Sequence, residues 1–281
     1  MFKKIARISG CVALLICGGC PATSGGAVSN WVLVDRFERQ SKLTDWIKID
    51  AQNETQPYVA DPQVATIERD AASDNAFMLR KPAADGIVGN RKAIGVKRLP
   101  MPIPVGATAT LHARINVESF PNNQSFGLTN AAPGDIPDLA YDALEPMIRI
   151  TDKAESNGDK NDGTLMVLSG YKTYRKITNP STGGAARPLS TDQWYELWCV
   201  INNATADAGG QRYDLYVRGG EFENQRLVAK DALFRMQRGQ PLTHFMMISN
   251  TGPQDKPYGN GGVRYDDIYL STGTLLSSPI R

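Results

Sequence analysis

Side chains that could act on an acidic sugar are spread along the chain. Cleavage of a uronate by β-elimination needs a cation to neutralise the carboxylate and a base, often tyrosine or histidine, to remove the C5 proton. His112 is followed two residues later by Arg114, and Tyr171 is followed by Lys172 and, after Thr173, by Tyr174. If the protein is a lyase, the catalytic candidates are His112, Tyr171 and Tyr174.

Binding a glycan needs fewer specialised groups than cleaving one. Aromatic rings stack on the apolar faces of pyranoses, while a few placed polar groups in a concave site hydrogen-bond the hydroxyls. The substrate-binding candidates are Arg114, Arg149, Tyr171, Lys172, Tyr174 and Asn250. The alternative for each is an ordinary residue of a sheet surface or loop, because spacing in the sequence does not fix distances in the fold.

Four carboxylates near the two ends of the chain are candidate metal ligands. They are Asp35, Glu38, Asp266 and Asp267. Calcium prefers several oxygen ligands, and these four would meet if the first and last strands paired. The alternative is a set of solvated edge carboxylates that discourage sheets from aggregating.

The elements that must position these residues are short strands. Apolar or alternating runs recur between clusters of Gly, Pro, Asn and Asp, and no long helical pattern interrupts them, which predicts a sandwich or barrel. In residues 111 to 118 the odd positions are apolar and the even ones polar, so His112, Arg114 and Asn116 are expected on an open face. Residues 152 to 163 and 179 to 187 are polar and indicate surface loops, and the carboxylates of the first are expected to be solvated.

The first residues resemble a targeting segment. Three basic residues and a short apolar run predict a signal peptide over residues 1–19. Gly18 and Gly19 before Cys20 resemble a bacterial lipobox, although Cys17 departs from its usual aliphatic residue. We expect a lipid on Cys20, a tether over residues 20–30, and a single domain over residues 31–281.

The resemblance also bears on where the protein goes. Pro21 is not the aspartate that retains some lipoproteins in the inner membrane, which favours the outer membrane. Without lipidation, the same segment predicts a periplasmic or secreted protein.

Charge and cysteine content exclude other classes. The chain has 31 basic and 29 acidic residues, and three of the basic ones lie in the expected leader, so the remainder is nearly neutral. Such a balance does not indicate a nucleic-acid partner. Cys199 is the one cysteine beyond Cys20, so no internal disulfide is expected, and its apolar surroundings indicate a buried thiol.

The order of several motifs resembles a known family. The motifs are Val34 to Glu38 followed by Trp46, Trp194 to Trp198 followed by Asn202 and Asn203, Asn250 to Gly252, and Tyr265 to Leu270. Together they look like a concanavalin A-like jelly roll of the laminin-G type over about residues 31 to 275. The resemblance implies two curved antiparallel sheets, adjacent first and last strands, and a concave face that often binds glycans.

The resemblance brings no active site with it. The paired-carboxylate strand of laminarinase-like members, in which two carboxylates flank the scissile bond, has no counterpart here. Of the alginate-lyase-like motifs, only Tyr171 to Arg175 offers a fragment.

The sequence therefore predicts an all-β, two-sheet antiparallel jelly-roll sandwich in an exported lipoprotein of the cell envelope that binds a polysaccharide or other glycan. The alternatives are a polysaccharide-degrading enzyme, either a lyase acting on a uronate-containing polymer or a glycoside hydrolase, and a structural envelope module. Fold alone does not decide among them.

Overall fold

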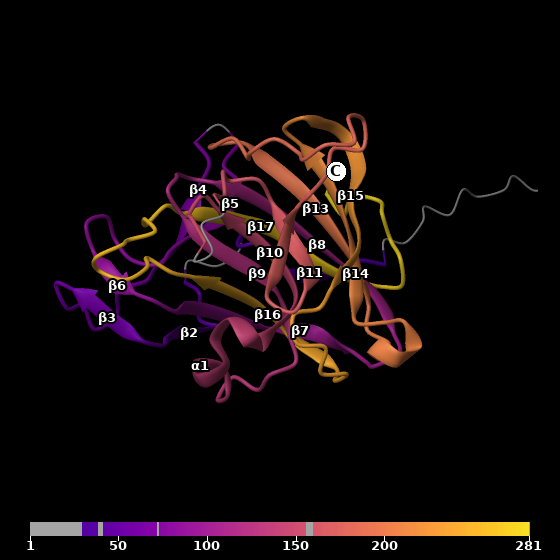
Figure 1. Ribbon diagram of the computed structural model, residues 1–281, viewed down its shortest axis with the longest axis horizontal. Helices are drawn as coiled ribbons and strands as arrows, with labels where there is room; N and C mark the ends of the chain where they lie inside the picture. Colours follow the sequence, from indigo (N-terminus) through magenta and orange to yellow (C-terminus); the bar gives the residue numbers. More distant parts are fainter. Residues whose placement is uncertain (1–29, 39–41, 72, 156–159, 281) are drawn as a thin grey trace, which may run out of the picture.

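The chain folds into two antiparallel sheets packed face to face (Figure 1). The computed structural model describes residues 30–38, 42–71, 73–155 and 160–280. The expected signal peptide, Cys20 and nearly all of the expected tether lie outside these residues. No helix in the described part of the chain is long and apolar enough to cross a membrane.

The first sheet contains both ends of the domain. From edge to edge its strands are β15 (Phe222–Leu233), β14 (Arg212–Gly219), β13 (Trp194–Asn202), β8 (Thr108–Val117), β17 (Val263–Thr272), β5 (Ala76–Lys81) and β4 (Val64–Arg69). The first strand, β1 (Val32–Asp35), pairs antiparallel with β17, Val32 lying opposite Leu270. The adjacency of first and last strands predicted from the sequence is confirmed.

The second sheet faces the first across the main core. Its strands, in order, are β12 (Thr173–Lys176), β11 (Met166–Gly170), β10 (Leu144–Thr151), β9 (Asn123–Thr129), β16 (Leu242–Ser249), β7 (Ala93–Ile103) and β2 (Trp46–Asp50). A separate small hairpin pairs β3 (Asn53–Gln56) with β6 (Val88–Asn90). The predicted two-sheet jelly-roll sandwich is therefore observed.

Alternation along the strands builds the main core. In β8, Leu111, Ala113 and Ile115 are buried between the sheets, as the sequence pattern predicts. The aromatic rings of Phe126 and Phe245 pack against them from the second sheet. Cys199 is also buried in this core as a free thiol, and burial raises its pKa.

The outer face of the second sheet is covered as well, which the sequence did not predict. A short helix, α1 (Ile136–Leu139), and the 3-10 turn η1 (Ala140–Ala143) pack on it. Beneath them lies a second apolar cluster, with members such as Ile94, Met147 and Ile248. Strands β9 and β10 are consequently buried along their whole length, so that their outward polar side chains must find partners within the protein.

Candidate functional site

A buried arginine organises the polar part of the second sheet's outer side. Arg149 lies two residues after Met147 in β10, so the two side chains point to the same face of the sheet, away from the main core. Its Nη2 donates to Oδ1 of Asn123 at 3.1 Å, and its Nη1 donates to Oε1 of Glu155 at 2.5 Å. Asn123 lies on the adjacent strand β9, so sheet pairing brings the two side chains together.

Aromatic and amide groups complete this arrangement. The Arg149 guanidinium lies 4.6 Å from the centroid of the Tyr174 ring, a cation–π contact. Asn123 donates to the Tyr141 hydroxyl at 3.3 Å, and Asn250 shares a hydrogen bond with Tyr141. We call these six residues, Asn123, Tyr141, Arg149, Glu155, Tyr174 and Asn250, the Arg149 network.

A chain of ion pairs extends the network to the surface. The Tyr174 hydroxyl accepts a hydrogen bond from Arg235 at 2.6 Å, and Arg235 is paired with Asp142 at 2.8 Å. The other oxygen of Asp142 lies 3.1 Å from Nζ of Lys172, which also lies 4.8 Å from the exposed ring of Tyr171. Five of the six predicted substrate-binding residues, all but Arg114, thus belong to one connected region.

The protonation states of this region follow from its contacts. Burial would raise the pKa of Glu155, but Arg149 and hydrogen bonds from Lys153 and Asn161 hold that pKa below its usual value. Burial raises the pKa of Tyr141 to about 12, so its hydroxyl stays neutral at physiological pH. The region therefore offers an ionised carboxylate at Glu155, a neutral phenol at Tyr141 and fixed cations.

Sequence reasoning missed several members of the region. Glu155 was expected to be solvated in its loop, whereas its carboxylate lies on Arg149. Asn123, Tyr141 and Arg235 carried no recognised motif. One usable signal was the polar run 122–125 directly before apolar residues in a strand, because polar residues on a buried strand need partners.

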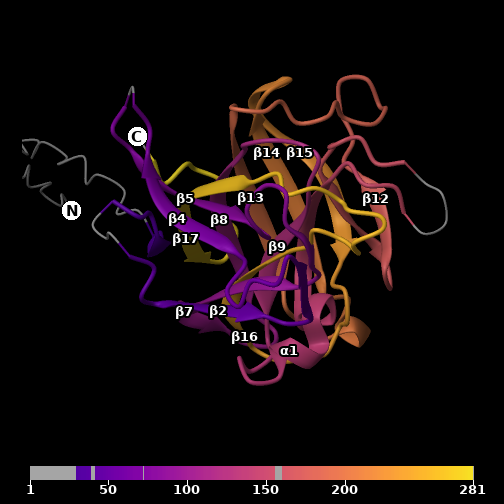
Figure 2. The same cartoon turned by 90° about the vertical axis from the view of Figure 1, so that its left-hand side faces the viewer.

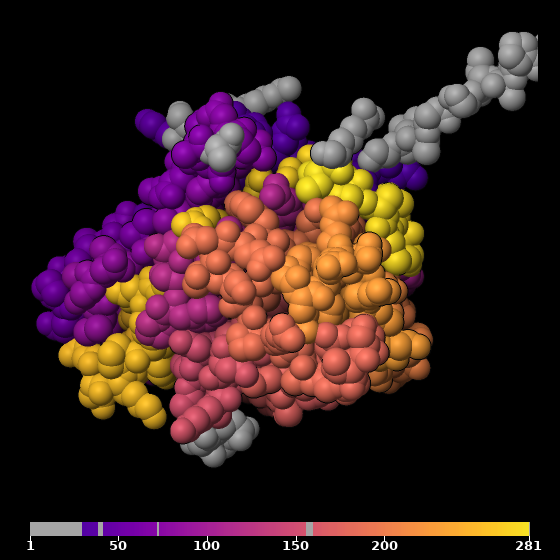
Figure 3. All heavy atoms as spheres, turned by 90° about the horizontal axis from the view of Figure 1, so that it is seen from above, coloured from indigo at the N-terminus to yellow at the C-terminus, as the bar shows by residue number. Residues whose placement is uncertain are grey.

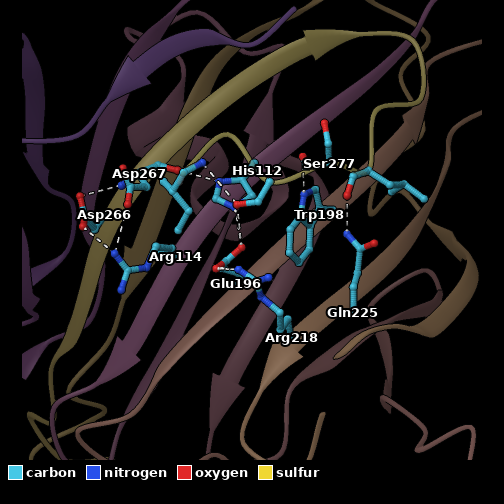
Figure 4. Close-up of polar contacts among 12 residues, drawn as sticks. His112, Arg114, Glu196, Trp198, Arg218, Gln225, Asp266, Asp267 and Ser277 are labelled. Atoms are coloured by element: carbon cyan, nitrogen blue, oxygen red, sulfur yellow. Dashed lines mark hydrogen bonds and ion pairs between the residues drawn. The ribbon is translucent and has the colours of Figure 1, made fainter. Parts of the chain in front are cut away.

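His112 lies on β8 of the first sheet, whereas Arg149 lies on β10 of the second. Figure 4 shows the surroundings of His112. Its Nδ1 is 2.9 Å from the backbone oxygen of Asp267, and its Nε2 is 3.5 Å from Glu196. The expectation that His112 lies on an open face was wrong, because its side chain is fully buried among aromatic rings that include Trp31 and Trp198. His112 therefore does not meet Tyr171 or Tyr174, and the three predicted catalytic residues do not form one site.

The end of the chain covers this face of the first sheet. The backbone oxygen of Ser277 accepts hydrogen bonds from Nε1 of both Trp31 and Trp198. Gln225 donates to the oxygen of Leu276, and Ser278 donates to Glu196 (Figure 4). From above, the yellow C-terminal residues lie against the orange strands of the first sheet (Figure 3).

Arg114 lies within ion-pair distance of two of the predicted calcium ligands. Its Nη1 lies 3.3 Å from Asp266 and 3.1 Å from Asp267. Asp35 accepts a hydrogen bond from the Trp46 indole at 2.9 Å and lies 3.4 Å from Lys97.

The fourth predicted ligand is also engaged. Glu38 accepts a hydrogen bond from the backbone of Ala76 at 2.9 Å. Within the residues that the structure describes, no group of three or more His, Cys, Asp or Glu side chains is arranged to hold a metal ion. In this arrangement cations and N–H donors engage all four carboxylates, and the calcium site stays a prediction.

The chain was compared with protein families, curated proteins and solved structures. No protein-family model and no curated protein matches the chain. Among solved structures, it is similar to a marine PL-14 alginate lyase from Aplysia kurodai, with 13% identity and a TM-score of 0.47 over 74% of this chain and 87% of that one. It is also similar to a GH131 β-glucanase catalytic domain from Podospora anserina, with 9% identity and a TM-score of 0.48 over 76% and 81% of the two chains. A third similar structure is peanut lectin, with 8% identity and a TM-score of 0.45 over 83% and 98%.

At such low identity the likeness concerns the fold alone, and the functional argument rests on the residues of this chain.

We expect the carboxyl group of Asp266 to make stability depend on pH. Burial, followed by the charge of Asp267, raises its pKa to about 8 despite the opposing effect of Arg114. Between the unfolded pKa of about 4 and the folded value, the folded state holds a proton that the unfolded state releases, so stability falls as pH rises. Asp266→Asn should remove this fall, measured by urea unfolding with EDTA at pH values of about 5.5 and 8.

Asp255→Asn, at an exposed position, is the matched control and should keep the wild-type dependence. An unchanged pH dependence in Asp266→Asn would show that Asp266 is ionised across this range in the folded protein.

Proposed function

We propose that the protein is an exported glycan-binding protein and that the Arg149 network, with Lys172 and Tyr171 at its rim, forms the binding surface. The observation that carries the proposal is the convergence of tyrosine rings, amides and a guanidinium on one side of the second sheet. Rings that stack on pyranoses beside groups that hydrogen-bond hydroxyls are what a sugar site requires. The Tyr171 ring is 62% exposed and is available for stacking.

The charges of the region favour an acidic glycan. Four cations, Arg149, Lys153, Lys172 and Arg235, surround two carboxylates, Glu155 and Asp142. Glu155 places its carboxylate on Arg149 as a uronate carboxylate would, since an arginine fork matches carboxylate geometry. An acidic sugar therefore binds by replacing Glu155 on Arg149.

A second candidate function is uronate cleavage. The observation that favours it is the position of the Tyr174 hydroxyl in the same connected region as Arg149, because β-elimination needs a proton acceptor near the cation that neutralises the carboxylate. In this scheme Arg149 binds the carboxylate and the Tyr174 oxygen takes the C5 proton. The C4–C5 double bond forms as the C4–O bond breaks, and Tyr174 returns a proton to the departing C4 oxygen. Tyr141 is less suited to act as a base because burial raises its pKa to about 12.

The proposed location of the protein rests on its first twenty residues alone. Residues 1–19 direct export, and a lipid on Cys20 attaches the domain to a membrane, with the outer membrane favoured. The tether after Cys20 leads directly into β1.

Arg149→Ala should lower the affinity for acidic polysaccharides. Loss of a charge-assisted hydrogen-bond pair should weaken binding by about tenfold or more. Titration calorimetry with alginate and polygalacturonate measures the effect, and neutral laminarin tests for charge selectivity. Arg212→Ala, which removes an exposed arginine on the first sheet, is the matched control and should bind like the wild type.

Glu155→Gln should act in the opposite direction. It removes the carboxylate that competes for Arg149 and should tighten binding of acidic polymers several-fold, with little effect on neutral ones. Weaker binding to Glu155→Gln would mean that Glu155 contacts the ligand directly. No binding of any polymer by the wild type would leave a structural envelope module as the better account.

Incubation with the same polymers separates binding from cleavage. A lyase produces unsaturated ends that absorb near 235 nm, and Tyr174→Phe, which keeps the ring but removes the hydroxyl, should abolish the absorbance while retaining binding. Reducing ends without absorbance would indicate a hydrolase. Bound polymer without any product would reject both enzymes.

Cys20→Ala tests the membrane attachment. Expression in a bacterial host should give wild-type protein in the membrane fraction with an acylated N-terminal peptide by mass spectrometry, and Cys20→Ala protein in the soluble fraction. Wild-type protein that is cut after residue 20 and carries no acyl group would show that the protein is periplasmic or secreted.

A further inference from the structure

A second polar site lies at the open side of the sandwich, far from the Arg149 network in the sheet order. There the edge strands of both sheets, β4 with β5 and β2 with β7, lie one above the other (Figure 2). A cavity of about 250 Å³ lies between them, with residues from all four strands in its wall. The wall includes the apolar side chains of Leu43, Ala65 and Met78 and the indole of Trp46.

The buried end of this cavity contains a guanidinium without a carboxylate partner. Arg80 is 2% exposed, and its Nη2 donates to the backbone oxygen of Ala93 at 2.5 Å. Within the described residues, its Nε has no hydrogen-bond partner and its guanidinium forms no ion pair, although the charge of Asp50 acts on it electrostatically. Burial lowers the pKa of Arg80 to about 10, so the side chain still carries its charge at neutral pH.

The neighbouring residues leave room for this side chain and add further unmatched groups. A Cβ atom at position 95 would come within 2.3 Å of Nη1 of Arg80, so glycine there is what admits the guanidinium. The Tyr265 hydroxyl, which interacts electrostatically with Arg80, has no hydrogen-bond partner among the described residues. A buried cation and a buried hydroxyl without partners are costly to the fold, and a bound anion offsets that cost.

We propose that this cavity binds a small apolar monocarboxylate, whose carboxylate pairs with Arg80 and whose hydrocarbon body lies against Trp46, Met78 and Leu43. The Nε–H of Arg80 has no acceptor among the described residues and can donate to a carboxylate. The cavity wall beyond Arg80 is mainly apolar. A sugar acid would leave its hydroxyl groups without partners there, so an apolar carboxylate fits better. Lys48 also lies at this wall, where Asp61 at 2.5 Å balances its charge, so Arg80 is the cation that a carboxylate would pair with.

The cavity limits the size of the ligand. Sites for drug-sized ligands span roughly 300–1,000 Å³, so a space of about 250 Å³ suits a carboxylate with a short chain or a single ring. A long fatty acid would extend out of the open side of the sandwich into water.

Calorimetry with hexanoate tests the proposal, with the change in tryptophan fluorescence from Trp46 as a second readout. The purified protein should bind hexanoate, and it should bind hexan-1-ol, acetate and glucuronate about tenfold more weakly or worse, because each lacks either the charge or the apolar body. Equal binding of hexanol would overturn the role of Arg80, and equal binding of glucuronate would overturn the apolar assignment.

Two variants locate the ligand. Arg80→Met keeps the length of the side chain without its charge, and Ala65→Trp fills the cavity without altering Arg80; each should weaken hexanoate binding by about tenfold or more. Thr66→Trp, at the exposed neighbouring position of β4, is the matched control and should bind like the wild type. If Arg80→Met fails to fold, Ala65→Trp alone tests whether hexanoate binds in the cavity. Unchanged hexanoate binding in the folded variants would overturn the proposal. No binding of hexanoate by the wild type would also overturn it.

Discussion

A buried polar group must be matched by a partner, and this requirement organises the second sheet. The sheet has apolar material against both of its faces, so water cannot serve every side chain that points away from it. Arg149 meets the requirement with Glu155 and Asn123. In the main core Arg80 meets it only in part, through one backbone oxygen. Two buried arginines thus mark two places where a carboxylate belongs, one supplied by the chain itself and one left for a ligand.

The two faces of the sandwich are used differently. On the first sheet, His112 and Glu196 lie beneath aromatic rings and the last residues of the chain, so their contacts serve to hold that cover in place. On the second sheet, the cover formed by α1 and η1 leaves the region of Tyr171 and Lys172 in contact with solvent. The second sheet therefore combines a buried cation, Arg149, with an accessible ring, Tyr171.

Much of the fold followed from alternation and turn signals. The apolar side chains of β8 were predictable because strand periodicity is local. The pairing of β1 with β17 and the two-sheet architecture were expected from the family resemblance. The cover over the second sheet was not, because α1 and η1 are too short to produce a helical pattern. The burial of His112 was missed for a related reason, since its cover comes from residues near both chain ends.

The candidate site, like the fold, could be predicted from the sequence only in part. Arg149, Tyr171, Lys172, Tyr174 and Asn250 were chosen by chemical type, and whether they met depended on sheet order that no local pattern encodes. Arg114 and His112 were chosen on the same chemical grounds but lie on β8 of the other sheet. Glu155 could not be assigned because a carboxylate in a polar loop has the same sequence signature whether it is solvated or paired.

The central place of the last strand has a consequence for the order of events during synthesis. Strand β17 separates β8 from β5 and also pairs with β1, so the first sheet has no continuous centre until residue 272 is available. Contacts between such distant parts of a chain form late and slowly. The first sheet therefore cannot close before its last strand has been synthesised.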